Sequence, residues 1–318
     1  MQSERKRRKA LVLLATAFFL CATTAYGAKK EVHFASVSWT GVTVKTELGK
    51  NILDSLGYKA TSQNLAVSII YKALDMGDVD IFLGNWMPSM ASIANQFFEK
   101  GTVVKYVANM PGAKYTLAAP SYVVDGGLKD LSDIAKYADK LDHKIYGIEP
   151  GNDGNLIVQA MIEENKFGLG DFKLIATGEP FMVSEVKTLS KEGKWVVFLG
   201  WSPHYMNQVI DMKYLTGSTA EAFGENDGTA TVYTNIRKGF EEKMPNVGHF
   251  LKNFIFPISM INEISLMLQE NKQLSHGEAG MAYLKEHPEI YQGWLEGVTT
   301  ADGSKPALPV FEAYLQKH

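Results

Sequence analysis

Four aromatic residues have the side chains and positions needed to hold a cation. They stand at the ends or starts of predicted strands and are Trp39, Trp86, Tyr115 and Trp201. A ring face attracts a cation through its quadrupole, by about 0.5–1 kcal/mol when exposed and about 2 kcal/mol or more when desolvated. A trimethylammonium group has no N–H to donate, so several ring faces are the physical means of binding it. The alternative is that each ring simply fills the core.

Two of the tryptophans lie in a repeated motif. The letters FLG precede Trp86 and a proline at 82–88, and they precede Trp201 and a proline at 198–203. An apolar run at 79–83 predicts a buried strand that Gly84 ends. Open α/β sheets bind ligands at the carboxyl ends of their strands. The repeat therefore predicts two walls of one cleft.

Strand and helix patterns alternate along the chain, which predicts an α/β protein with a mostly parallel sheet. The expected strands cover 31–38, 61–66, 79–83, 115–124, 144–148, 172–176, 195–201 and 229–235. The expected helices cover 44–56, 68–76, 89–100, 131–141, 155–167, 179–191, 247–254 and 258–269. Ser68 is expected to cap the second of these helices.

The order of these elements predicts two lobes. Residues 28–114 begin the first lobe, 115–225 form the second, and 226–318 return to complete the first. Two crossings between lobes make a hinge, and hinge closure around a ligand is a known switching mode.

The N-terminus has the pattern of a secretory signal peptide at 1–27. A basic head at 5–9 precedes an apolar run at 11–20 and small residues at cleavage spacing. A membrane anchor is the alternative, but the run is shorter than the roughly 20 residues that span a bilayer. The pattern predicts export, and Cys21, the only cysteine, is expected to leave with the signal.

Charge and composition exclude several classes of function. Without residues 1–27 the chain has 27 basic and 34 acidic residues, a net charge of −7 with His neutral. A mildly acidic surface argues against nucleic acid as a partner, since nucleic acid requires a basic face.

The sequence also lacks the patterns of a metal site. The histidines lack metal-ligand spacing, and the turn at 152–155 lacks the Glu of a calcium loop. No nucleotide-binding motif is present, so we expect no metal and no cofactor.

The chain contains five longer motifs: SWT at 38–40, FLGNWMP at 82–88, GAKYTL at 112–117, YGIEPGNDGN at 146–155 and FLGWSPH at 198–204. Together they resemble the choline and glycine-betaine periplasmic binding proteins of ABC transporters. The resemblance implies a two-lobed type II periplasmic binding protein fold with a hinge and an interlobe ligand cleft. It also implies that the four aromatic residues surround a trimethylammonium group and that Asn152 reaches the ligand's polar end.

One position departs from the family's pattern. Choline-selective members carry Asp two residues after the first cage Trp, where this chain has Gly41. An Asp there would repel a ligand carboxylate, because two like charges about 4 Å apart cost roughly 1 kcal/mol in water and more in a cleft. Gly41 therefore favours a zwitterion, carnitine or glycine betaine, ahead of choline. Turn geometry alone is the other explanation of this glycine.

Two features beside the rings bear on the ligand's polar end. The turn at 150–155 opens a helix whose free N–H groups suit a carboxylate. His204 follows the second motif, and either lines the cleft or braces its loop.

The sequence thus predicts a monomeric periplasmic solute-binding protein that delivers a quaternary ammonium compound to an ABC permease in the inner membrane. A choline-selective binding protein is the alternative within the family. An exported enzyme acting on a quaternary amine is a second class, with Glu149, Asp153 and His204 as its candidates. A sensor domain for a membrane receptor is a third.

Overall fold

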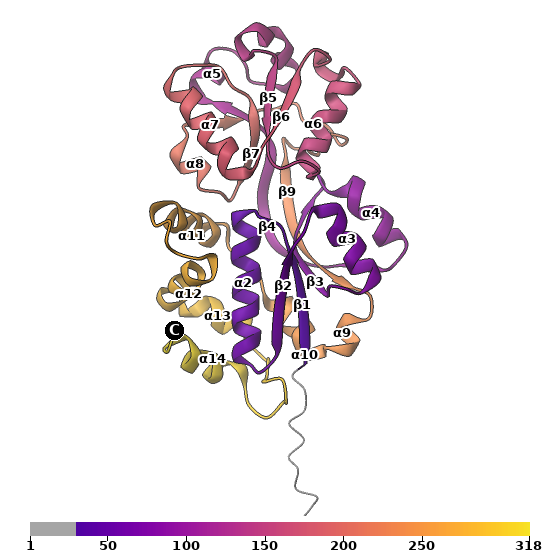
Figure 1. Ribbon diagram of the computed structural model, residues 1–318, viewed down its shortest axis with the longest axis vertical. Helices are drawn as coiled ribbons and strands as arrows, with labels where there is room; N and C mark the ends of the chain where they lie inside the picture. Colours follow the sequence, from indigo (N-terminus) through magenta and orange to yellow (C-terminus); the bar gives the residue numbers. More distant parts are fainter. Residues whose placement is uncertain (1–29) are drawn as a thin grey trace, which may run out of the picture. The chain divides into compact units, whose positions relative to one another are not determined.

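The computed structural model describes residues 30–318 (Figure 1). The strands are β1 (Glu31–Ser36), β2 (Lys59–Asn64), β3 (Ile81–Met87), β4 (Val103–Pro120), β5 (Lys144–Gly147), β6 (Lys173–Ala176), β7 (Phe198–Ser202), β8 (Met212–Tyr214) and β9 (Thr229–Arg237). The predicted signal peptide at 1–27, with Cys21, lies outside the described residues.

Helices alternate with these strands and then dominate the C-terminal part of the chain. They are α2 (Thr40–Ser55), α3 (Val67–Met76), α4 (Ala91–Glu99), α5 (Ser121–Asp125), α6 (Asp153–Glu163), α7 (Glu179–Lys191), α8 (Met206–Val209), α9 (Phe240–Lys243), α10 (Pro245–Asn253), α11 (Ile258–Glu270), α12 (His276–Glu286), α13 (Pro288–Trp294) and α14 (Ala307–Leu315). Two further segments are 3-10 helices, η1 (Leu131–Leu141) and η2 (Lys166–Gly168).

The sheet is mixed rather than mostly parallel. In the described residues its strand order is β2-β1-β3-β9-β4-β7-β5-β6, with β8 beside β4. The pairs β1–β2, β1–β3, β5–β6 and β5–β7 are parallel, as expected of βα repeats. Every antiparallel pair includes β4 or β9. The prediction was wrong because it missed the length of β4, which begins at Val103 and not at Tyr115.

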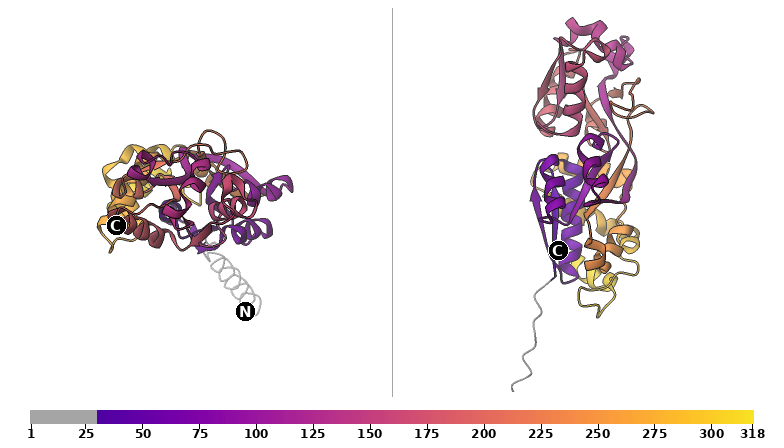
Figure 2. Two further views of the ribbon diagram at one scale, coloured as in Figure 1. Left: turned by 90° about the horizontal axis from the view of Figure 1, so that it is seen from above. Right: turned by 90° about the vertical axis from the view of Figure 1, so that its right-hand side faces the viewer.

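Two lobes are visible within Glu31–His318, which form one compact unit (Figures 1 and 2). One contains β5–β7 with α5–α8, and the other contains β1–β3 with α2–α4 and α9–α14. Strand β4 runs from one lobe to the other, and its partner changes at Lys114, which lies opposite Thr229 of β9 and Ser202 of β7. The boundary predicted at 114/115 adjoins this change of partner, but the domain limits themselves stay a prediction.

Helix α2 begins at the cleft and presents its first turn to it. Its apolar residues Val44, Leu48 and Ile52 recur at helical spacing and are buried. Helices α11 and α12 pack against it, and Leu48 closely approaches Gly280 of α12. The helix starts directly after Trp39, so the position of this ring depends on the packing of α2.

Two predictions of element boundaries need correction. Gly84 does not end the strand, since β3 continues to Met87. A Cβ on Gly84 would lie 2.9 Å from the Phe82 ring and from a Val42 methyl. The glycine is therefore required by close packing, and the strand continues with a register shift after Phe82. Ser68 does not cap α3, whose cap residue is Ala66 without a side-chain hydrogen bond.

Substituting Gly84 with Ala tests this packing argument. We expect a loss of about 1–3 kcal/mol in the free energy of unfolding, because the added methyl overpacks a buried contact. Urea unfolding measures the loss. The matched control is Gly293→Ala in α13, where a Cβ would meet no atom within 4 Å. Equal stability of the two variants would contradict the account of Gly84.

Candidate functional site

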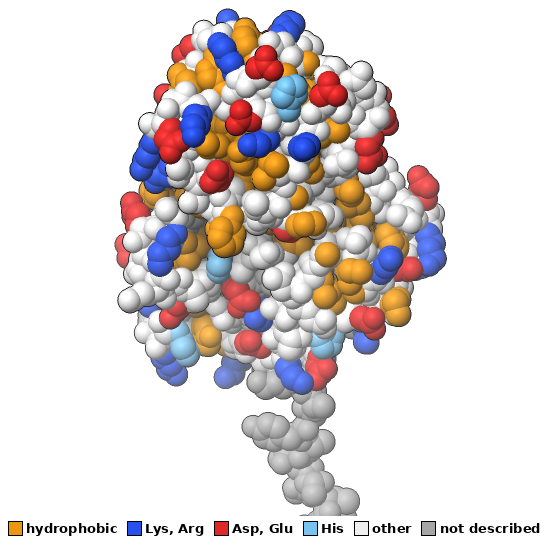
Figure 3. All heavy atoms as spheres, turned by 45° about the horizontal axis from the view of Figure 1, so that its top comes forward, with side chains coloured by type: hydrophobic (Ala, Val, Ile, Leu, Met, Phe, Trp, Pro, Cys, Tyr) orange, Lys and Arg blue, Asp and Glu red, His pale blue; other side chains and the backbone are white. Residues whose placement is uncertain are grey.

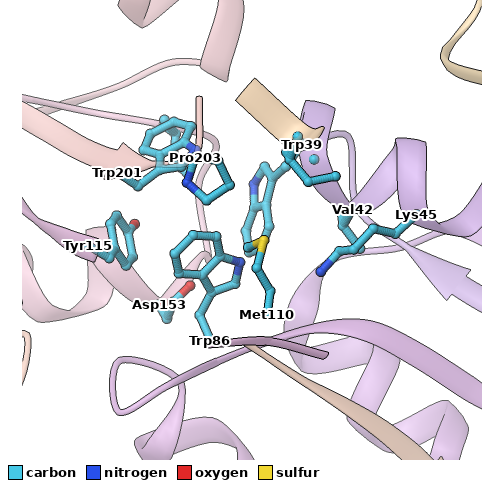
Figure 4. Close-up of a pocket in the computed structure, with 12 residues that line it drawn as sticks. Trp39, Val42, Lys45, Trp86, Met110, Tyr115, Asp153, Trp201 and Pro203 are labelled. Atoms are coloured by element: carbon cyan, nitrogen blue, oxygen red, sulfur yellow. The ribbon is translucent and has the colours of Figure 1, made fainter. Parts of the chain in front are cut away.

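The structure brings the four predicted aromatic residues to one cavity between the lobes. Trp39 directly precedes α2, Trp86 lies in β3, Tyr115 in β4 and Trp201 in β7. All four line a cavity with about 490 Å³ not filled by atoms, including its mouth (Figure 4). Trp86 is half-buried and the other three are buried. The sequence-based grouping of these rings is therefore correct in space, although the prediction that they contact a ligand remains a prediction.

The rings are arranged edge to face rather than stacked. The Tyr115 ring centroid lies 5.9 Å from that of Trp86, with the planes at 63°. It lies 6.0 Å from that of Trp201, with the planes at 89°. Steeply inclined rings present faces in different directions, so they can surround a compact cation on several sides.

Tyr115 reaches the cavity because a glycine makes room for it. A Cβ on Gly154, in the first turn of α6, would lie only 1.9 Å from the Tyr115 hydroxyl oxygen. That hydroxyl is buried without a hydrogen-bond partner. Gly154 belongs to the GNDGN motif at 151–155, so part of that motif serves to seat a cage ring.

Asp153 lies beside the rings as an unpaired buried carboxylate. It lines the cavity and is 1% exposed, and neither carboxylate oxygen has a hydrogen-bond partner. Burial raises the pKa of Asp153 to about 6. Ser89 and the backbone N–H groups of Asp153 and Gly154 lie near enough to oppose this rise. The Ser89 hydroxyl itself donates to the Trp86 carbonyl at 3.3 Å. The sequence singled out Asp153 only as a candidate acid, because its burial could not be inferred.

Glu149 links one cage ring to the opposite lobe. The indole Nε1 of Trp39 donates to Glu149 Oε1 at 2.6 Å, which fixes the plane of this ring. Burial raises the pKa of Glu149 to about 7, and Glu179 and Asp153 add to the rise while the Trp39 N–H opposes it. The negative charges of this region are thus concentrated around the rings.

Lys45 is a cavity residue that the sequence reasoning missed. It lies in α2, one turn after Gly41, and is 1% exposed. Its Nζ donates to the Leu83 carbonyl at 2.7 Å and to Asn109 Oδ1 at 3.0 Å. Burial lowers the pKa of Lys45 to about 7. The sequence could have indicated this burial, since Lys45 stands on the apolar face of the predicted helix, between Val44 and Leu48.

Gly41 lines the cavity from the first turn of α2. Its φ is not positive, so the backbone does not require glycine, and turn geometry does not explain this residue. A Cβ there would lie 3.3 Å from a methyl group of Ile261. This contact would be tight, so packing against α11 also favours glycine, and no side chain projects from position 41 into the cavity.

Asn152 and His204 are engaged in local structure and are not among the residues that line the cavity. Asn152 caps α6: its Oδ1 accepts from the Asn155 N–H at 2.9 Å, and its amide donates to the Glu149 carbonyl. The Nδ1 of His204 accepts from the Met206 N–H at 3.1 Å, and its Nε2 lies 2.9 Å from Glu179 Oε1. Their predicted contacts with a ligand remain predictions.

Glu179 joins this histidine to the other lobe. It is 3% exposed, and the Thr40 hydroxyl donates to it at 2.5 Å. Burial raises the pKa of Glu179, but His204 and Thr40 outweigh this and hold it below its ordinary value. The carboxylate therefore connects α7 and the loop after β7 to the first turn of α2.

The described residues, 30–318, contain no group of three or more His, Cys, Asp or Glu side chains arranged to hold a metal ion. Over the same residues, every helix falls short of the length and apolar character needed to cross a bilayer.

The comparison with known families decides what kind of protein carries this cavity. Residues 30–286 match the model of the substrate-binding domain of ABC-type glycine betaine transport systems. The chain belongs to this family. Its members are transport substrate-binding proteins, which bind small ligands and deliver them to a permease. The family predicted from the motifs is confirmed.

Individual relatives give the range of ligands in the family. The chain is similar to an ABC-transporter choline-binding protein solved with choline, at 40% identity, covering 90% of this chain and 98% of that one, with a TM-score of 0.86. It is 26% identical to a glycine betaine/carnitine transport binding protein of Listeria monocytogenes, over 57% of this chain and 56% of that one. It is 22% identical to a glycine betaine/proline betaine-binding periplasmic protein of Salmonella typhimurium, over 81% of this chain and 87% of that one.

Replacing Asp153 with Asn is expected to stabilise the ligand-free protein, and more so at higher pH. The carboxyl pKa is about 6 when folded and about 3.9 when unfolded, so wild-type stability falls as the pH rises from about 4 through 6. The variant lacks this loss, which is on the order of 1–3 kcal/mol at full ionisation. Urea unfolding at about pH 5 and about pH 8 measures the difference.

The exposed Asp171→Asn serves as the control for this comparison. It should show the same small effect at both pH values. A stability gap between wild type and Asp153→Asn that does not widen with pH would contradict the assignment.

Proposed function

We propose that this chain captures a quaternary ammonium compound in its aromatic cavity and delivers it to the membrane permease of an ABC importer. The observation that carries the proposal is the convergence of Trp39, Trp86, Tyr115 and Trp201 on one desolvated space. Each ring face contributes about 2 kcal/mol or more to a buried cation, and a quaternary ammonium group is the cation that hydrogen bonds cannot hold. Asp153 adds an unpaired negative charge beside the rings.

A carboxylated ligand, glycine betaine or carnitine, is favoured over choline. Gly41 places no charge where choline-selective members carry Asp, and its backbone conformation does not require glycine. The similarity to a glycine betaine/carnitine transport binding protein agrees with this choice.

Choline is the second candidate, and one observation favours it. The similar structure solved with choline is 40% identical and aligns with 90% of this chain. The difference at position 41 is the physical reason for ranking choline below the zwitterions.

Binding without turnover is the form of action that we propose. The ring nitrogens of His204 are both engaged, one with the Met206 N–H and the other with Glu179, so neither is free to transfer a proton. The proposal includes a monomer exported to the periplasm, with lobes bounded near 114/115 and 225/226. A role in sensing would require a receptor in place of the permease.

Calorimetric titration with glycine betaine, carnitine and choline tests the proposal. We expect one-to-one binding, with the ligand recovered unchanged by mass spectrometry. Trp86→Ala or Trp201→Ala should weaken binding by roughly 30-fold or more, since each removes a desolvated ring. Trp195→Ala is the control, because Trp195 packs on Tyr137 and is not among the residues that line the cavity. Near-wild-type affinity in both cage variants would refute the cage, and turnover would refute a binding-only role.

The Gly41→Asp substitution tests ligand choice. The new carboxylate should lower the affinity for glycine betaine relative to choline by roughly tenfold, through repulsion of like charges. Gly41→Asn is the matched control, since it has the same shape without the charge and meets the same Ile261 methyl. An unchanged affinity ratio in Gly41→Asp, or an equal change in both variants, would remove charge at position 41 as the cause.

A further inference from the structure

Lys45 is a buried cation without a counter-ion. Its side chain lines the cavity and is 1% exposed, and none of the ion pairs within residues 30–318 includes it. Both hydrogen-bond acceptors of its Nζ are neutral, the Leu83 carbonyl and the Asn109 side chain. The Phe256 ring, with its centroid 5.6 Å from Nζ, is also neutral and supplies no counter-charge. An ammonium has three N–H donors, so one donor remains for another partner.

A buried charge of this kind is costly to keep. Removing one charge from water costs several kcal/mol even after the protein relaxes, unless an opposite charge is close. In Figure 4 the nitrogen of Lys45 points into the space beside Trp39 and Met110. The partner that this ammonium lacks is therefore best supplied from within the cavity, by an anionic group of the ligand.

Asp153 is a buried anion without a counter-ion in the same cavity. Neither of its oxygens has a hydrogen-bond partner, although the residue is 1% exposed. Figure 4 places it beside Trp86 and Tyr115, on the other side of the cavity from Lys45. On the face drawn in Figure 3, basic and acidic side chains are interspersed over both lobes. In the cavity, by contrast, the unpaired positive charge of Lys45 and the unpaired negative charge of Asp153 lie on opposite sides.

We propose that Lys45 and Asp153 are the two charge anchors of a zwitterionic ligand. Lys45 binds the ligand carboxylate, and Asp153 with the rings binds the quaternary ammonium group. This inference rests on the proposed function and extends it, because it assigns the carboxylate site to a residue that neither the motifs nor the comparisons single out.

Gly41 and Lys45 act together in this scheme. They are four residues apart in α2, the spacing at which an acidic side chain pairs with a following lysine. An Asp at position 41 would supply the counter-charge that Lys45 lacks and would leave no net charge for a ligand carboxylate. Glycine at this position keeps the lysine available.

Two variants and two ligands test the assignment. Lys45→Met keeps the length of the side chain and removes its charge. We expect it to weaken glycine betaine by roughly 10- to 100-fold, the value of a lost charged hydrogen bond. Choline, which has the same head group and no carboxylate, should bind unchanged or tighter. Asp153→Asn should weaken both ligands, because both carry the quaternary group.

Lys50→Met is the matched control on the same helix. Lys50 forms a surface pair with Glu47 and is not among the cavity residues, so its loss should leave both affinities unchanged. Choline binding by Lys45→Met shows that this variant is folded.

Proton linkage provides a second test on the wild-type protein. Above about pH 7, where Lys45 has lost part of its charge, binding of a carboxylate should draw a proton to it. Calorimetry in buffers of different ionisation enthalpy should show more proton uptake with glycine betaine than with choline. Asp153 and Tyr115 line the cavity beside the rings, whereas Glu149 and Glu179 are not among its lining residues. We expect these groups to respond alike to both ligands, so the difference isolates Lys45. This difference should vanish in Lys45→Met.

The outcomes separate this inference from the proposed function. If the wild type binds neither ligand, the proposed function fails, and the inference with it. If the wild type binds glycine betaine and Lys45→Met binds it as well, the function stands and the inference is overturned. An equal loss of both ligands in Lys45→Met, or equal proton uptake with both in the wild type, also overturns it.

Discussion

The aromatic cavity depends on contacts that hold the two lobes together around it. Trp39 and Trp86 come from the lobe that contains β1–β3, whereas Trp201 comes from β7 in the other lobe. Hydrogen bonds cross between the lobes, from Trp39 to Glu149 and from Thr40 to Glu179. The attraction of a ring for a cation is weaker in water than in a desolvated site. Under the proposed function, closure of the lobes would make the rings effective, and a ligand would stabilise the closed form by the contacts that it adds there.

Two buried charges in the cavity lower the free energy of unfolding of the ligand-free protein. Lys45 and Asp153 are nearly inaccessible and lack partners of opposite charge, and the pKa of each is shifted by burial toward the neutral form. Burial of an unpaired charge is unfavourable, and residues of this kind cluster at functional sites. A ligand with both charges would relieve both penalties at once. In this view, selectivity follows from what the empty site lacks as much as from what it contains.

Close packing places the rings as much as hydrogen bonding does. Gly84 in β3 lets the Phe82 ring and Val42 of α2 approach closely, and Gly154 leaves room for the Tyr115 hydroxyl. Both glycines belong to motifs that also carry cage or charged residues, so the motifs combine residues that contact the cavity with residues that make space for them. The crossing of β4 and β9 between the lobes then brings Tyr115 next to Trp86 and Trp201.

The sequence by itself determined the family, the alternation of strands and helices, and the four rings as a group, because apolar periodicity and ordered motifs are local properties. Only the tertiary structure decided the mixed character of the sheet and the pairing of His204 with Glu179, since these depend on residues far apart in the chain. The tertiary structure also decided that Lys45 and Asp153 have no partner of opposite charge. A lysine or aspartate letter specifies a charge, but whether that charge meets water, a partner or a cavity is set by packing from both lobes.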